Sequence, residues 1–217
     1  MFATIPPTLQ ADPGILKTRF ISFSVPVSPV AAVVETALRV KLVSLHHVNP
    51  PYTGGPSVPF TGFEGQVRWV GPPMNFIEST STGTPLIASS LQCTPNYQDW
   101  STIGLLHVTG SAMVPSSVYE VVNVAASCMG IEASCTAVSA PLSISTTRWG
   151  DVETPYNPPS ATTQPDVGDI GALVNKFRSA PGAPIKPRAL LAGVDAFGNI
   201  TPEMMSVDLG FGHIAAC

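Results

Sequence analysis

The chain has 217 residues, of which 11% are charged, and a formal net charge of −4. Its 23 prolines and 18 glycines make up about a fifth of the chain, which argues against a helical bundle because both residues destabilise helix interiors. The charge balance lacks the basic excess of a nucleic-acid-binding domain, and no apolar run reaches the roughly 18 residues that span a bilayer.

Residues 1–16 contain three prolines and show no periodic pattern, so we expect a loose leader. The first residues have neither the basic segment nor the apolar segment that a signal peptide carries. The start of the chain therefore fits either the mature part of a secreted protein or an intracellular protein.

From residue 17 onwards apolar and polar residues alternate, which predicts strands with one buried face. In residues 36–43, Leu38, Val40 and Leu42 point to one face of such a strand. The same kind of pattern predicts further strands at residues 19–25, 64–70, 86–92, 103–109, 118–126 and 142–147.

Within residues 64–70, the alternation predicts that Val67 and Trp69 are buried while Gln66 and Arg68 face solvent. Clusters of proline, glycine, asparagine and serine separate the predicted strands. Short strands at this spacing are typical of an antiparallel β-sandwich. We therefore expect a mainly β fold, an immunoglobulin/fibronectin-like sandwich over residues 17–148, with Trp69 in its core.

A different pattern begins at residue 149, where a proline-rich stretch precedes a predicted helix over residues 166–178. Asp166 and Asp169 fall in its first turn, where carboxylates cap free backbone N–H groups. Four apolar side chains share one face of this helix: Ile170, Leu173, Val174 and Phe177. We expect residues 149–217 to form a small helical segment. Because the chain stops within an apolar run, we expect that segment to be truncated.

The four cysteines, Cys93, Cys128, Cys135 and Cys217, form neither a metal-type nor a redox-type CxxC pair. Cys128 and Cys135 are close enough in sequence to close a small loop. Three fully paired connectivities exist, and buried free thiols are the alternative to them. The serine-, threonine- and proline-rich composition favours at least one disulfide and an extracellular location.

Two blocks of sequence carry a resemblance to a known family. The first is FEGQVRWVGPP (63–73) with LQC (91–93) and DWSTIGLL (99–106). The second is TRWGDV (147–152) with DVGDI (166–170) and KFRSAPGAPIK (176–186). Together they resemble the C-terminal region of large, mostly uncharacterised secreted or surface proteins of environmental bacteria. In those proteins a β-sandwich precedes a dockerin-like pair of half EF-hands, which implies an extracellular or cell-surface location.

The dockerin-like resemblance implies Ca²⁺ as a cofactor, because such loops supply the six to eight oxygen ligands that this ion prefers. By this resemblance, Asp151 begins the first loop, Asp169 ends it, and Asn157 and Asp166 contribute oxygens. A proline-rich insertion at residues 152–165 replaces the regular ligand spacing. The alternative is that Asp166 and Asp169 are helix caps.

The second half departs further from the dockerin-like pattern. It retains Asp195, Asn199 and Asp208, but His213 stands where the resemblance requires the carboxylate that ends the loop. Since imidazole is a poor ligand for Ca²⁺, a second calcium site is less favoured than the first.

The leading interpretation is a non-catalytic extracellular adhesion or scaffold module, stabilised by Ca²⁺ if the first loop binds it, with a protein or glycan at a cell surface as its partner. Tyr52 and Trp100 are the candidate ligand-binding residues, and Phe60 and Tyr97 are further aromatic candidates. The alternative for each aromatic side chain is a role in packing the loops. A carbohydrate-binding module, which binds a glycan through Tyr52 or Trp100, is the third interpretation.

The second interpretation is a Ca²⁺- or histidine-dependent hydrolase of a small ester, lactone or glycoside. His46, His107 and Glu120 are the residues that a metal site on a β fold would draw together, although their spacing gives no support for it. The chain has no Gly-x-Ser-x-Gly motif and no phosphate-binding glycine motif. We therefore name no catalytic residue.

Overall fold

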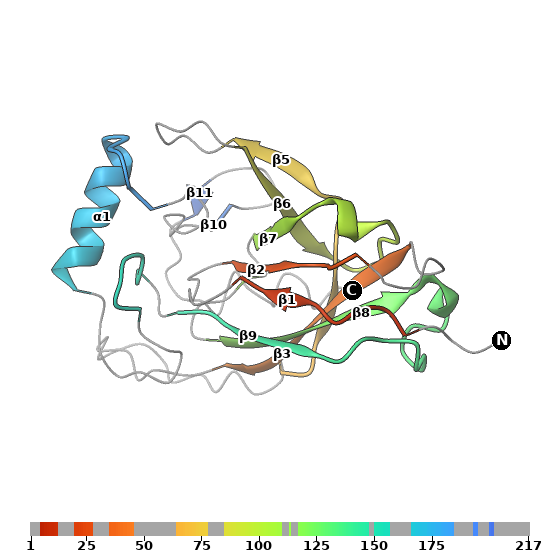
Figure 1. Ribbon diagram of the computed structural model, residues 1–217. Coiled ribbons are helices and arrows are strands. Elements are labelled where there is room, and N and C mark those ends of the chain that lie inside the picture. Colours follow the sequence, from red (N-terminus) through yellow and green to blue (C-terminus); the bar gives the residue numbers. More distant parts are fainter. Residues whose placement is uncertain are drawn as a thin grey trace.

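The computed structural model describes residues 5–12, 20–27, 35–45, 64–77, 85–109, 113, 117–147, 150–156, 166–184, 193–194 and 200–201. These parts are mainly β with one short α-helix, as predicted (Figure 1). The strands are β1 (Gln10–Ala11), β2 (Ile21–Ser24), β3 (Thr36–Leu45), β4 (Val67–Val70), β5 (Met74–Ile77), β6 (Pro85–Gln92), β7 (Leu105–Thr109), β8 (Ser117–Ala125), β9 (Leu142–Ser145), β10 (Gly193–Val194) and β11 (Ile200–Thr201).

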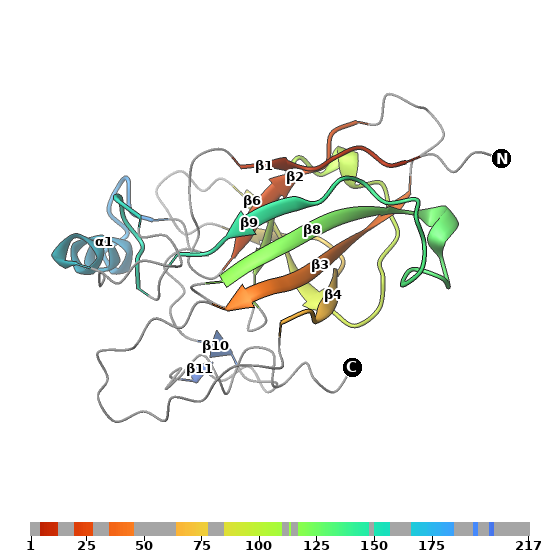
Figure 2. The same cartoon turned by 90° about the horizontal axis from the view of Figure 1, so that it is seen from below.

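Nine strands form one sheet in the order β1-β2-β7-β6-β4-β3-β8-β9, with β5 paired to β6. The sheet curls until it is nearly closed, so that β1 and β9 lie side by side (Figures 1 and 2). The described strands thus follow a single curled sheet where we expected two stacked sheets. The short strands β10 and β11 form a separate antiparallel pair.

The expectation of a fully antiparallel sheet is wrong at one pair, because β6 and β7 run parallel, with Ile87 opposite Leu106. Two adjacent parallel strands must be joined by a segment that carries the chain from the end of the first strand back to the level at which that strand began. Residues 93–104 make this connection and include the 3-10 helix η1 (Trp100–Thr102). The alternation of apolar and polar residues within a strand does not reveal the path of the connection that follows it.

Strand β3 lies near the middle of the sheet and pairs with β4 and β8. Leu38, Val40 and Leu42 are almost completely buried on its inner face, which confirms the predicted alternation. Arg39, on the opposite face, pairs in register with Trp69 of β4 and Val122 of β8. Both faces of β3 therefore meet other parts of the protein.

Strand β4 differs from its prediction. Trp69 is buried as expected, but Val67 is 38% exposed and Arg68 is only 7% exposed. The guanidinium of Arg68 donates to the Val67 carbonyl at 2.7 Å and to Oε1 of Gln66 at 3.5 Å. Burial lowers the pKa of Arg68. Nearby oxygens thus accept hydrogen bonds from Nη1 and Nη2 of a buried cation that the alternation placed in solvent.

The apolar core is divided between the two faces of the sheet. The inner cluster includes Phe23, Trp100 and Tyr119, all nearly or completely buried. The outer cluster is formed by side chains of β3, β4 and β8 together with two from the loop after β8: Ala37, Trp69, Val122, Val124, Ala125, Cys128 and Ala137. An exposed apolar sheet face is unfavourable in water, so the outer cluster requires a cover. The loop that follows β8 provides it.

Helix α1 (Val167–Phe177) confirms the predicted helix and its caps. The carboxylate of Asp166 accepts a hydrogen bond from the Gly168 amide at 2.7 Å, and that of Asp169 accepts one from the Asp166 amide at 2.9 Å. This reciprocal arrangement is a capping box. No helix within the described residues is both long and apolar enough to cross a membrane.

Candidate functional site

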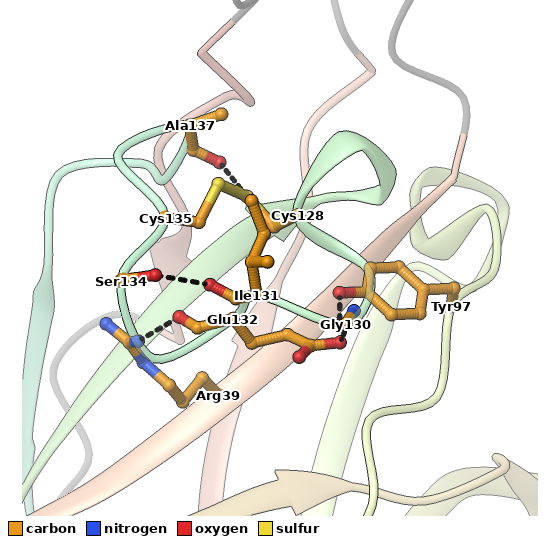
Figure 3. Close-up of a disulfide and its surroundings, with 9 residues drawn as sticks. All are labelled: Arg39, Tyr97, Cys128, Gly130, Ile131, Glu132, Ser134, Cys135 and Ala137. Carbon is orange, nitrogen blue, oxygen red and sulfur yellow. Dashed lines mark hydrogen bonds between the residues drawn. A yellow bond between two sulfur atoms is a disulfide. The ribbon is translucent and has the colours of Figure 1, made fainter.

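A disulfide-closed loop covers the outer cluster at the end of β8. The loop begins with the 3-10 helix η2 (Ala126–Cys128) and is closed by a disulfide between Cys128 and Cys135 (Figure 3). Gly130 adopts a φ of 84° in it, a left-handed conformation that glycine adopts at little cost. The returning chain pairs with β8, since the Ala125 amide donates to the Ala137 carbonyl at 3.0 Å.

Glu132 holds the disulfide-closed loop in place (Figure 3). Its Oε1 accepts hydrogen bonds from the Gly130 amide at 2.9 Å and from the Tyr97 hydroxyl at 3.1 Å. Its main-chain carbonyl accepts one from Nη1 of Arg39 at 3.3 Å. Glu132 therefore ties the loop to itself, to β3 and to the segment that connects β6 with β7.

The hydrogen bonds around Glu132 change the acidity of both side chains that share them. The Gly130 amide and the Glu132 amide, with a smaller contribution from the Tyr97 hydroxyl, hold the pKa of Glu132 below its usual value. Burial raises the pKa of Tyr97 to about 12, and the hydrogen bond to the Glu132 carboxylate and its negative charge act in the same direction. At neutral pH the neutral phenol thus donates to an ionised carboxylate.

Two large apolar side chains of the disulfide-closed loop point into solvent. Met129 is 63% exposed and Ile131 is 57% exposed, while Cys128 between them and β8 is fully buried. The backbone that carries Met129 and Ile131 is closed by the disulfide and held by Glu132. The loop therefore presents an apolar pair on a restrained backbone.

The aromatic candidates from the sequence lie in different places. Trp100 is 1% exposed, and its Nε1 donates to the Thr36 carbonyl at 2.8 Å, so it packs in the inner core instead of facing a ligand. Tyr97 is half-buried and supports the disulfide-closed loop. Tyr52 and Phe60 lie outside the described residues.

The candidate calcium ligands are engaged in other contacts. Oδ1 of Asp169 accepts hydrogen bonds from the Val152 amide at 2.7 Å and the Glu153 amide at 2.9 Å, and Oδ2 accepts one from the Asp166 amide. Asp166 is exposed and caps the helix. A carboxylate surrounded by three N–H donors has its lone pairs directed at hydrogen atoms and not at a cation.

The remaining candidate calcium ligands do not complete a site. Asp151 is fully buried, its carbonyl accepts a hydrogen bond from the Thr147 hydroxyl, and Asn157 lies outside the described residues. Across the parts of the chain that the structure describes, no three or more His, Cys, Asp or Glu side chains gather in a way that would hold a metal ion. As arranged, the described carboxylates do not fit Ca²⁺. Asp169 instead fastens the start of α1 to residues 152–153.

The histidine candidates are not drawn together either. His107 on β7 is 4% exposed, and its Nδ1 lies 2.8 Å from Oγ of Ser22, which is equally buried. Phe20 packs against the same imidazole ring, with the ring centroids 5.7 Å apart. Glu120 lies on β8, which is not a neighbour of β7 in the sheet, and His46 lies outside the described residues. The Ser22–His107 pair is therefore almost completely removed from solvent.

Met129, Ile131 and Glu132 are candidate residues that the sequence patterns did not indicate. The only sequence signal for them is the spacing of Cys128 and Cys135, which allows a small closed loop. The bond from Tyr97 to Glu132 joins residues 35 positions apart, so no local pattern reveals it. No protein-family model, no curated protein and no solved structure matches this chain.

Proposed function

We propose that this protein is a non-catalytic binding module that works outside the cell, and that Met129 and Ile131 are its main contact residues. Its partner is a protein surface with an apolar pocket or groove that accepts these two side chains. The observation that carries the proposal is the display of both side chains on a loop closed by the Cys128–Cys135 disulfide.

The restraint of the disulfide-closed loop supports binding because a loop that is already ordered loses little conformational entropy on association. Methionine is flexible and polarisable, so it adapts to irregular apolar pockets. Burying a fully exposed methionine or isoleucine contributes up to about 1.5–3 kcal/mol. Two such side chains on one restrained loop therefore supply enough burial to form the energetic centre of a small interface.

The disulfides support an extracellular location. Cys128 and Cys135 are bonded to each other, Cys93 is also disulfide-bonded, and no described cysteine is free. Disulfides persist in oxidising compartments and are rare in the cytosol. The resemblance to secreted and surface proteins of bacteria points the same way, and with it an immunoglobulin-like sheet followed by a dockerin-like segment remains part of the proposal.

The test is a selection of phage-displayed random peptides on the disulfide-intact protein. Peptides that it enriches are then titrated against the Met129→Ser/Ile131→Ser variant. We expect apolar peptides whose affinity falls at least about tenfold in this variant, since about 1.4 kcal/mol corresponds to a factor of ten.

A matched control is the Val43→Ser/Met74→Ser variant, because Val43 and Met74 are also exposed apolar side chains, 42% and 61% exposed, on β3 and β5. We expect it to bind the selected peptides with unchanged affinity. The proposal is overturned if no peptide is enriched. It is equally overturned if the loop variant and the control variant bind the enriched peptides alike.

A further inference from the structure

Helix α1 turns an apolar stripe away from the body of the protein. Val167 is 82% exposed and Phe177 is 91% exposed, and Ile170 and Val174 between them are also exposed. The side of α1 that packs on the protein instead contains Asp169 and Ala172, which are buried. The helix lies at one end of the molecule in both views, and its outer side is left exposed within the part of the chain that the structure describes (Figures 1 and 2).

The apolar stripe has the spacing of a helix-pairing seam. Val167, Ile170, Val174 and Phe177 are separated by three, four and three residues, which is the a/d pattern of a coiled coil. Such a seam packs against a second helix with the same spacing. A helix that leaves its apolar stripe in water forgoes the stabilisation that its burial would supply.

The stripe is symmetric about Ala172. Val167 and Phe177 lie five residues on either side of it, and Ile170 and Val174 lie two residues on either side. An antiparallel pair of α1 helices related by a two-fold axis at this level places Phe177 opposite Val167 of the second copy. The same axis places Ile170 opposite Val174 of the second copy. The stripe is thus complementary to itself in one register.

The charges of α1 favour the antiparallel orientation. Asp166 caps the first turn, whereas Lys176 is in the last turn and Arg178 follows it. An antiparallel pair brings the acidic end of each helix to the level of the basic end of the other, and it also aligns the helix dipoles favourably. A parallel pair would bring like charges together at both ends.

From these observations we propose that α1 is a self-association surface, through which a second copy of this chain binds by antiparallel helix pairing. One short helix pair buries less than the roughly 800 Å² per partner of a standard interface. We therefore expect weak association, with a dissociation constant of about 0.1–1 mM. The proposal does not depend on the disulfide-closed loop, which lies at the opposite end of the molecule (Figure 1).

The experiment measures the self-association of the full chain by sedimentation equilibrium over a range of concentrations that brackets this dissociation constant. Two variants, Ile170→Lys and Val174→Glu, each place a charge in the stripe, and we expect each to abolish detectable association. On mixing the two variants, the introduced lysine lies opposite the introduced glutamate only in the antiparallel register. We therefore expect mixing to restore association to at least the wild-type level.

Met74→Lys is the matched control, because Met74 is as exposed as Ile170 but lies on β5. It should associate as the wild type does, and circular dichroism should show that all variants are folded. A wild type that stays monomeric throughout overturns the proposal, as does loss of association in Met74→Lys. Association that survives Ile170→Lys, or that mixing fails to restore, overturns it as well. A wild-type monomer whose unfolding temperature falls on Ile170→Lys would show that this chain covers its own stripe.

Discussion

The hydroxyl of Tyr97 donates a hydrogen bond of 3.1 Å to Oε1 of Glu132, across 35 residues of sequence. The same oxygen accepts the Gly130 amide, and the Glu132 carbonyl accepts Nη1 of Arg39. The disulfide alone closes the loop covalently, whereas the hydrogen bonds of Glu132 fix the position of the closed loop relative to the sheet. The orientation of Met129 and Ile131 therefore depends on Tyr97 and Glu132 as well as on the cysteines.

The first prediction concerns the ionisation of Tyr97. Because burial and the Glu132 carboxylate raise its pKa to about 12, it should lose its proton about two pH units above an ordinary tyrosine. Ultraviolet titration of phenolate absorbance measures this, and Tyr97→Phe should remove the late step. In Glu132→Gln, which keeps an acceptor oxygen but no charge, the step should move to lower pH.

The raised pKa of Tyr97 also sets the sign of a stability effect at alkaline pH. The folded state holds this proton more tightly than the unfolded state does, so the stabilisation is complete below about pH 10. It is lost as the pH rises from there to about 12. A Tyr97→Phe variant whose stability falls over this range as much as the wild type would contradict the assignment.

The second prediction concerns Glu132 at acid pH. Its pKa in the folded state is lowered from 4.5, so its stabilising effect is present above this value and is lost as the pH falls through the lower, folded pKa. The protection of the amides of residues 129–135, measured as exchange rates corrected for the intrinsic effect of pH, should fall over that range. Glu132→Gln should show faster exchange at neutral pH and little further change on acidification. An identical acid response in both proteins would contradict this prediction.

The third prediction concerns the carboxylate of Asp169. Asp169→Ala leaves three backbone N–H groups without their acceptor, and we expect it to destabilise the docking of α1 by about 2–4 kcal/mol. Asp169→Asn keeps one acceptor oxygen and should have a smaller effect. Asp166→Ala removes only the cap on Gly168 and should cost about 1 kcal/mol. Hydrogen exchange of the α1 amides measures how much each substitution destabilises the helix. Equal protection of these amides in the wild type and the three variants would contradict the prediction.

A fourth prediction follows for calcium. Since the oxygens of Asp169 already accept three N–H groups, millimolar Ca²⁺ should leave the unfolding temperature unchanged. Differential scanning calorimetry with Ca²⁺ and with a chelator measures this. A rise in unfolding temperature with Ca²⁺ that disappears in Asp169→Asn would restore the calcium site that the resemblance implies.

The fifth prediction separates packing from ligand binding at Trp100. Because this side chain is 1% exposed in the inner core, Trp100→Ala should destabilise the fold by about 3–5 kcal/mol. Trp69→Ala should cost a similar amount, as it removes the largest member of the outer cluster. Chemical denaturation gives both values. A Trp100→Ala protein of near-normal stability would contradict the packing role and support Trp100 as a ligand-binding residue.

The sequence predicted those features of the fold that depend on local alternation. The inward face of β3 and the capped helix α1 were both correct, because period-two patterns and first-turn carboxylates act within a few residues. The order of the strands and the parallel β6–β7 pair depend on the path of the chain between strands, which alternation does not encode.

The candidate site was predicted less well, because burial and hydrogen bonding there are decided over long distances. Trp100 follows a polar segment typical of a loop, yet its indole reaches the Thr36 carbonyl of a distant strand. The apolar face of α1 was recognised, but its direction depends on Asp169, which binds the amides at residues 152 and 153 and turns that face outward. Neither contact is visible in a local pattern.

The binding role of the disulfide-closed loop is tested most directly by nuclear magnetic resonance of methionine methyl groups. The six methionines give few signals, and Met129→Ser and Met74→Ser assign the two that matter. On adding a peptide selected on the wild-type protein, we predict that the Met129 methyl signal shifts or broadens while that of Met74 stays in place. A Met129 signal that remains unchanged at saturating peptide would contradict the proposed role of the loop.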